Sequence, residues 1–201
     1  MAYKRNPMRS ERIASLSRYV MIDALLPTIV SRCYTVNFNP LSDAVIEEYL
    51  KSDLQISEYY AKIYAALAMG KIGTAKKLSK SEEFSKKMQE SMHLLKNSKG
   101  MENFERIELT KAISADKRGI FDYLDIFTIW FRDVLYFKAT KDTENVILKD
   151  ERSAIKKRAE VSSYEGIQKI LDSIDTARTR LKANVNPELV MELLFLTMSD
   201  N

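Results

Sequence analysis

Few side chains in this sequence could take part in chemistry by their type alone. His93 is the single histidine and Cys33 is the single cysteine. These numbers exclude an intramolecular disulfide framework, a cysteine-rich zinc site and a metal site built from several histidines. His93 stands in a polar stretch without an Asp, Glu or Ser constellation around it, so we expect an ordinary surface or packed histidine. We expect Cys33 to be a small buried residue.

A glycine-containing segment has some letters of a phosphate-binding loop, Gly70-Lys71-Ile72-Gly73-Thr74. Such a loop follows a strand and reads GxxxxGK before Ser or Thr, whereas this segment stands between two stretches with helical spacing. The end of a helix is therefore the better interpretation of Gly70. The sequence predicts no autonomous ATPase activity, no bound metal and no cofactor.

The composition favours a helical protein. The chain has 201 residues, which is room for one ordinary domain or two small ones. Hydrophobic residues make up 45% of it and charged residues 30%, so a sizeable core is possible. Only 5 glycines and 4 prolines leave few tight turns, which argues against a many-stranded sandwich or barrel and for long helices. Because Asp23 and Pro27 interrupt the apolar run 19–30, we expect no membrane span, no signal peptide and a cytoplasmic location.

Hydrophobic spacing predicts an all-α fold. The expected helices are one that begins after the N-cap Ser42, followed by 55–69, 72–78, 79–97, 102–114, 117–138, 149–160, one from the Ser162 cap to Leu181, and 188–198 after Asn186 and Pro187. Segment 117–138 is the most apolar, and Asp122, Asp125 and Arg132–Asp133 leave one narrow polar stripe on it. We expect this segment to be the central buried helix of a bundle. One short strand near 34–38 is predicted without a partner.

The strand follows the segment Leu26-Pro27-Thr28-Ile29-Val30-Ser31-Arg32-Cys33 and precedes Pro40-Leu41-Ser42. This pattern resembles the clamp-loader AAA+ subunits, of which the Ser-Arg-Cys triplet is a signature. The resemblance implies that Arg32 acts in trans as an arginine finger on the γ-phosphate of ATP bound to a neighbouring subunit, with Ser31 and Cys33 positioning it. A guanidinium suits this role because it is always charged and aims several donors at the charge that develops in phosphoryl transfer.

The resemblance covers residues 25–201. It implies a Ser-Arg-Cys loop and strand at 25–39, an AAA+ lid-like three-helix module at 40–79 and a clamp-loader collar-like helical domain at 80–201. Gly73 stands where the sensor arginine of the lid would be, which fits a subunit that does not bind ATP itself. The implied function is subunit assembly within a DNA-directed DNA polymerase holoenzyme during DNA replication. The collar would contact other clamp-loader subunits in a hetero-oligomer, and DNA would be contacted only indirectly.

Residues 1–24 are similar to a different family, the adenylosuccinate lyases of the fumarase/aspartase superfamily. Lys4, Asn6, Pro7 and Glu11 match the second half of the signature loop of that family, and Arg9 stands beside them. The resemblance implies substrate contacts for Lys4 and Asn6, but the serine that would act as the base has no counterpart here. The junction of the two patterns near 24–26 indicates a chimeric chain. A fragment of adenylosuccinate lyase, an enzyme of purine biosynthesis, is therefore one alternative.

A generic helical DNA-binding protein is the second alternative, because the net charge is +4. Residues 1–24 carry five basic and two acidic side chains, whereas the rest of the chain carries 27 basic and 26 acidic ones. Most of the net charge thus belongs to the first 24 residues. The nearly neutral helical body provides no independent reason to expect contact with DNA.

Overall fold

The regular structure is helical throughout the residues that the computed structural model describes, which are 26–31, 39–99, 102–117 and 119–201. This confirms the predicted all-α class. The chain divides into two compact units, Met1–Asn39 and Pro40–Asn201. In the first unit α2 spans Pro27–Val30, and the strand expected near 34–38 lies outside the described residues. None of the helices in the described ranges is long and apolar enough to cross a membrane.

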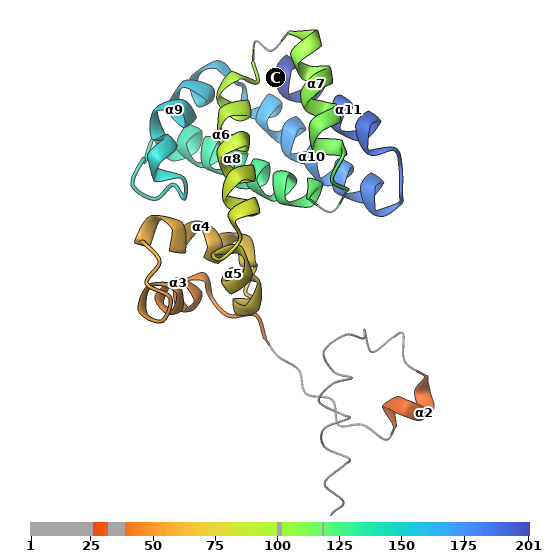
Figure 1. Cartoon of the computed structure of the whole chain (residues 1–201). Coiled ribbons are helices and arrows are strands. Elements are labelled where there is room, and N and C mark those ends of the chain that lie inside the picture. The colour runs from red at the N-terminus through yellow and green to blue at the C-terminus, as the bar shows by residue number, and fades with distance from the viewer. Residues whose placement is uncertain (1–25, 32–38, 100–101, 118) are drawn as a thin grey trace, which may run out of the picture. The chain divides into compact units, whose positions relative to one another are not determined.

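Three short helices pack on one another at one end of the second unit: α3 (Asp43–Ser52), α4 (Glu58–Ala68) and α5 (Ile72–Leu78) (Figure 1). Gly70 lies between α4 and α5 with φ +80, and a Cβ atom there would collide with Pro40. The Leu41 amide also donates to the Gly70 carbonyl (3.0 Å). Gly70 therefore ends a helix, as predicted. Because it has no side chain, the segment at Pro40 and Leu41 can pack closely against it. Tyr60 of α4 is 46% exposed, whereas Ile63 and Tyr64 of the same helix are buried.

The rest of the unit is a bundle around one long helix. Its elements are α6 (Glu82–Asn97), α7 (Asn103–Ser114), α8 (Ile120–Thr140), the 3-10 turn η2 (Lys149–Glu151), α9 (Arg152–Val161), α10 (Tyr164–Lys182) and α11 (Pro187–Asp200). Helix α8 packs against α6, α9 and α10, and α11 packs against α10 and α7 (Figure 1). Phe127, Trp130 and Phe131 of α8 are wholly buried. The prediction of a central buried helix is confirmed.

Two predicted helix starts are displaced by one to three residues. Helix α6 is capped by Ser81, whose hydroxyl accepts from the Phe84 amide (3.1 Å), and not by Ser79. Helix α10 is capped by Ser163 and not by Ser162. In the last helix the predicted cap is confirmed, because the Asn186 side chain accepts from the amide of Glu188 (2.9 Å).

The predicted polar stripe of α8 is wrong at Asp133, which is buried. Its side chain is only 4% exposed, because the chain that follows α8 folds back over it. The carboxylate accepts from the amides of Ile147 (3.1 Å) and Leu148 (2.8 Å). Burial raises the pKa of the Asp133 carboxyl, and these two hydrogen bonds oppose the rise. Asp133 therefore fixes this connection through its backbone.

The same connection reaches α4. The Lys62 ammonium donates to the carbonyl of Val146 (3.2 Å), the residue before the two amides that Asp133 binds. The rings of Tyr64 in α4 and Phe84 in α6 also meet edge to face, with centroids 6.1 Å apart. Residues 40–79 are therefore joined to the bundle by polar and aromatic contacts.

We expect Asp133→Ala to destabilise the fold, because it leaves the buried Leu148 amide and the part-buried Ile147 amide without an acceptor. Such a group costs about 1–3 kcal/mol, so the free energy of unfolding should fall by about 2 kcal/mol or more. Urea unfolding followed by circular dichroism measures this. The matched control is Asp172→Ala on the exposed side of α10, which should change the value by about 0.5 kcal/mol at most. Equal effects of the two substitutions would refute the role given to Asp133.

Candidate subunit interface

The residues singled out from the sequence for chemistry lie mostly outside the described part of the chain. This holds for Arg32, Cys33, Lys4, Asn6 and Arg9. Their roles, and the adenylosuccinate lyase alternative that depends on residues 1–24, therefore stay predictions. Ser31 is described: it is exposed, and its hydroxyl donates to the carbonyl of Thr28 (3.2 Å) at the end of α2. Ser31 is therefore the only one of these predicted site residues that the described ranges include.

His93 is an ordinary surface residue, as expected. It is exposed on α6, and its Nε2 lies 3.4 Å from the Asn97 amide nitrogen. Among the described residues there is also no group of three or more His, Cys, Asp or Glu side chains that could hold a metal ion.

The most distinctive surface is the outer side of α11. Leu189, Leu193 and Leu196 are spaced four and three residues apart, so they share one side of the helix. They are 52%, 42% and 40% exposed, whereas Leu194 and Phe195 of the same helix are buried. A helix that is apolar on its buried side and also on its exposed side lacks the polar outer side of an ordinary surface helix. This stripe of leucines is unexplained by the fold of the described chain.

Helix α7, which packs against α11, also has exposed apolar side chains. Phe104 and Ile107 on its outer side are 69% and 41% exposed, and α7 and α11 pack against each other (Figure 1). We call Phe104, Ile107, Leu189, Leu193 and Leu196 the α7–α11 face. When a partner covers water-exposed leucine and phenylalanine side chains, the free energy of the system falls. The chemistry this face supports is therefore protein association.

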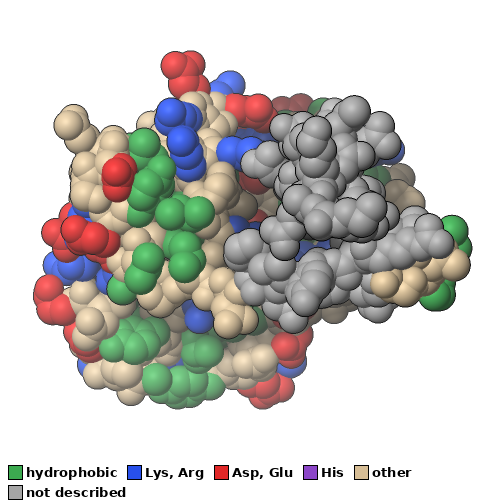
Figure 2. All heavy atoms as spheres, turned by 90° about the horizontal axis from the view of Figure 1, so that it is seen from below, with side chains coloured by type: hydrophobic (Ala, Val, Ile, Leu, Met, Phe, Trp, Pro, Cys, Tyr) green, Lys and Arg blue, Asp and Glu red, His purple; other side chains and the backbone are tan. Residues whose placement is uncertain are grey.

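Exposed apolar side chains occur elsewhere, but they have no such spacing. The end of the second unit formed by α3 and α5 is seen in Figure 2, where hydrophobic side chains lie in separate groups among charged ones. The large exposed apolar residues of 40–79 are Leu41, Val45, Tyr60 and Met69. Scattered residues of this kind are normal on protein surfaces. Regular helical repetition sets the α11 stripe apart from them.

The α11 stripe was missed in the sequence although a signal for it exists. The segment Met191-Glu192-Leu193-Leu194-Phe195-Leu196 is apolar at nearly every position, which is more than one buried side of a helix needs. The spacing correctly predicted a helix with Asn186 as its cap. Which leucines are buried depends on where α7 and α10 pack, and this information is absent from α11 itself.

The fold and the α7–α11 face are those of an all-helical domain suited to binding another protein. A family model described as "DNA polymerase III, delta subunit, C terminal" matches residues 82–200, from the first residue of α6 to the last of α11. The chain therefore belongs to this family of DNA polymerase III subunit domains, which confirms the resemblance stated from the sequence.

The chain is also similar to the DNA polymerase III subunit delta' of Bacillus subtilis (strain 168). The two are 28% identical over 179 residues, which cover 88% of this chain and 54% of the relative. The chain thus spans about half the length of this relative.

A pair of neighbouring leucines tests the two sides of α11. Leu194→Ala empties a core position and should cost about 2–5 kcal/mol of unfolding free energy. Leu193→Glu adds a charge on the exposed side and should change that free energy by about 0.5 kcal/mol at most. Urea unfolding of both variants is the measurement. If Leu193→Glu were as destabilising as Leu194→Ala, the outer side of α11 would be part of the core.

Proposed function

We propose that the chain is a clamp-loader subunit of the delta-prime type, and that its helical domain acts in subunit assembly during DNA replication. The observation that carries this is the α7–α11 face, which lies within the segment that matches the DNA polymerase III family. The relative from Bacillus subtilis is itself called subunit delta' of DNA polymerase III. On this proposal the partners are other subunits of the same clamp loader.

The division into a lid (40–79) and a collar (80–201) is part of this proposal. Two observations support it. The family match begins at residue 82, where α6 begins, and α3, α4 and α5 pack among themselves. The collar would then supply the surface for assembly, and the lid would be attached to it through Lys62 and Tyr64.

Covering the leucine stripe supplies part of the driving force for a contact of this kind. Complete burial of one leucine side chain contributes about 1.5–3 kcal/mol, and the stripe offers three that are each two-fifths exposed or more. Association has to offset the loss of translational and rotational freedom, so further contacts from α7 are needed. The exposed aromatic ring of Phe104 is the largest of these.

We expect Leu193→Glu to weaken assembly with the other clamp-loader subunits by about tenfold or more, because it buries a charge in an apolar contact. Size-exclusion chromatography of the mixed subunits, with a titration to obtain the dissociation constant, is the measurement. Val45→Glu is the matched control, since it places the same charge on another half-exposed apolar residue, in α3. An unchanged dissociation constant for Leu193→Glu would show that the α7–α11 face is not the contact.

Arg32 would be the catalytic contribution of this subunit. By the resemblance of its Ser-Arg-Cys triplet it would donate to the γ-phosphate of ATP bound to a neighbouring subunit. The guanidinium would stabilise the charge that develops on the transferring phosphoryl group. The chain itself would hydrolyse no ATP.

We expect Arg32→Ala to lower the ATPase rate of the assembled complex at least about tenfold, since arginine fingers of GTPases contribute about 10³–10⁵ in rate. Assembly should be unaffected, which separates this result from the effect of Leu193→Glu. Arg32→Lys is the informative second variant, because lysine keeps the charge but lacks the planar fork of donors. A wild-type ATPase rate in both variants would remove the finger from the proposal.

A further inference from the structure

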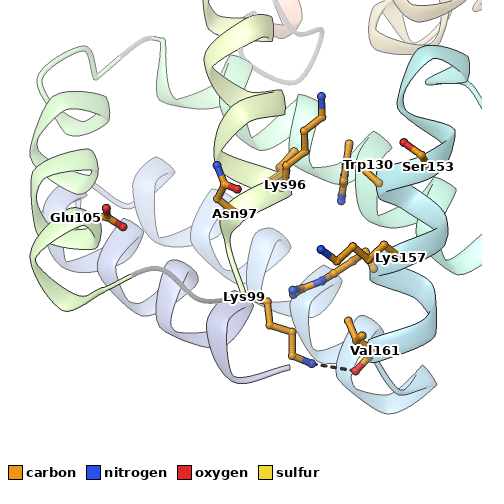
Figure 3. A pocket seen from close by; sticks show the side chains of 11 residues that line it. Lys96, Asn97, Lys99, Glu105, Trp130, Ser153, Lys157 and Val161 are labelled. Atoms are coloured by element: carbon orange, nitrogen blue, oxygen red, sulfur yellow. Dashed lines mark hydrogen bonds between the residues drawn. The ribbon is translucent and has the colours of Figure 1, made fainter.

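A hollow of about 740 Å³ is lined mainly by residues of α6, α8 and α9 (Figure 3). This volume is within the range of small-molecule sites. Its lining combines apolar side chains such as Leu95 and Ala154 with four cationic ones, Lys96, Lys99, Lys157 and Arg158. The family match and the proposed assembly function assign nothing to this hollow, which we call the α6–α9 hollow.

The cations of the hollow are only partly neutralised. Lys96 pairs with Glu151 (2.6 Å), and the lining itself contains one carboxylate, Glu105. The remaining excess is two positive charges. Within the described residues Lys157 forms no ion pair and is exposed. Concentrating like charges in a concave site costs free energy unless a counter-charge is bound there.

Other donors of the hollow are held by backbone carbonyls and not by acids. The Lys99 ammonium donates to the carbonyl of Val161 (2.9 Å), and the Arg158 guanidinium donates through Nη2 to the carbonyl of Met198 (2.6 Å). Arg158 is buried and its Nε–H has no acceptor. These contacts position the cations without cancelling their charge.

Trp130 also lines the hollow and carries a donor without a partner among the described residues. It is wholly buried, yet its indole N–H has no acceptor, although buried tryptophans usually find one. In Figure 3 the indole nitrogen of Trp130 and the ammonium of Lys157 point toward the same part of the hollow, from α8 and α9 respectively. An anion placed there would contact the free ammonium of Lys157 and lie close to the buried indole of Trp130.

We infer that the α6–α9 hollow binds a phosphate group, either free or as part of a small phosphate ester. A phosphate monoester carries about −1.5 to −2 charges at neutral pH, which matches the excess of two positive charges. A single carboxylate would leave one of them uncompensated. The phosphate oxygens accept from Lys157 and Lys99, and the apolar lining leaves room for the organic part of an ester.

The full chain carries its own reporter for this site, because Trp130 is its single tryptophan. In a ¹⁵N-labelled sample its indole N–H gives one side-chain signal. We expect inorganic phosphate or adenosine monophosphate to shift this signal in a saturable way. The two titrations distinguish the sources: tighter binding of the nucleotide indicates an ester, and equal binding indicates free phosphate. Acetate at the same ionic strength should have no comparable effect.

The decisive variants are neighbours on α9. Lys157→Gln should raise the half-saturating phosphate concentration about fivefold or more, since it removes the free cation that faces Trp130. Lys156→Gln removes the same charge from an exposed residue outside the lining and should change that concentration less than about twofold. The inference is overturned if neither phosphate compound shifts the indole signal, if acetate shifts it equally, or if the two variants behave alike. It is independent of whether the α7–α11 face mediates assembly.

Discussion

Helix α8 is apolar on nearly every side, so protein must cover it on nearly every side. This requirement organises the bundle, because α6, α9 and α10 all pack on α8. The hydrophobic contacts are completed by charged groups at the edges of the helix. Arg178 of α10, for example, pairs with Asp125 (2.5 Å) and donates to the Thr128 hydroxyl (3.0 Å), both of them on α8. Dispersion and burial hold α8 in place, and such polar contacts select which side of it each neighbour covers.

Lys87 makes polar contacts of this kind at the start of α8. Its ammonium contacts Glu83 (2.7 Å), Asp116 (3.1 Å) and Asp122 (3.1 Å), so it joins α6 to the connection before α8 and to α8 itself. Burial lowers the pKa of Lys87, but the hydrogen bonds to the three carboxylates outweigh burial and raise that pKa. A Cβ atom at Gly119 would collide with both Lys87 and Asp116. The absence of a side chain at 119 is therefore a condition for this cluster.

The sequence predicts the features of this fold that depend on neighbouring residues. It does not predict those that depend on residues far apart along the chain. Helix order and the burial of α8 follow from local spacing, and they were predicted correctly. The caps of α6 and α10 were displaced because each segment offers two serines. Ser79 is already used by α5, where its hydroxyl donates to the Lys76 carbonyl (3.1 Å). Asp133 was assigned to the wrong environment, since the amides that it binds lie 14 and 15 residues further along the chain. The α6–α9 hollow exists only once two helices flank Trp130, so no local pattern indicates it.

The helical body is nearly neutral overall, but its fold places cationic side chains and exposed apolar side chains in separate regions. Residues 25–201 have 27 basic and 26 acidic side chains, and from that balance neither an anion site nor an apolar contact would be expected. Folding brings Lys96, Lys99, Lys157 and Arg158 into one hollow and leaves the outer side of α11 to its leucines. Neither arrangement is needed to bury α8, and the unpartnered Trp130 N–H even costs stability. The fold does not require the charged hollow or the exposed leucines, and contact with water does not favour them. A binding partner is the physical explanation for such features.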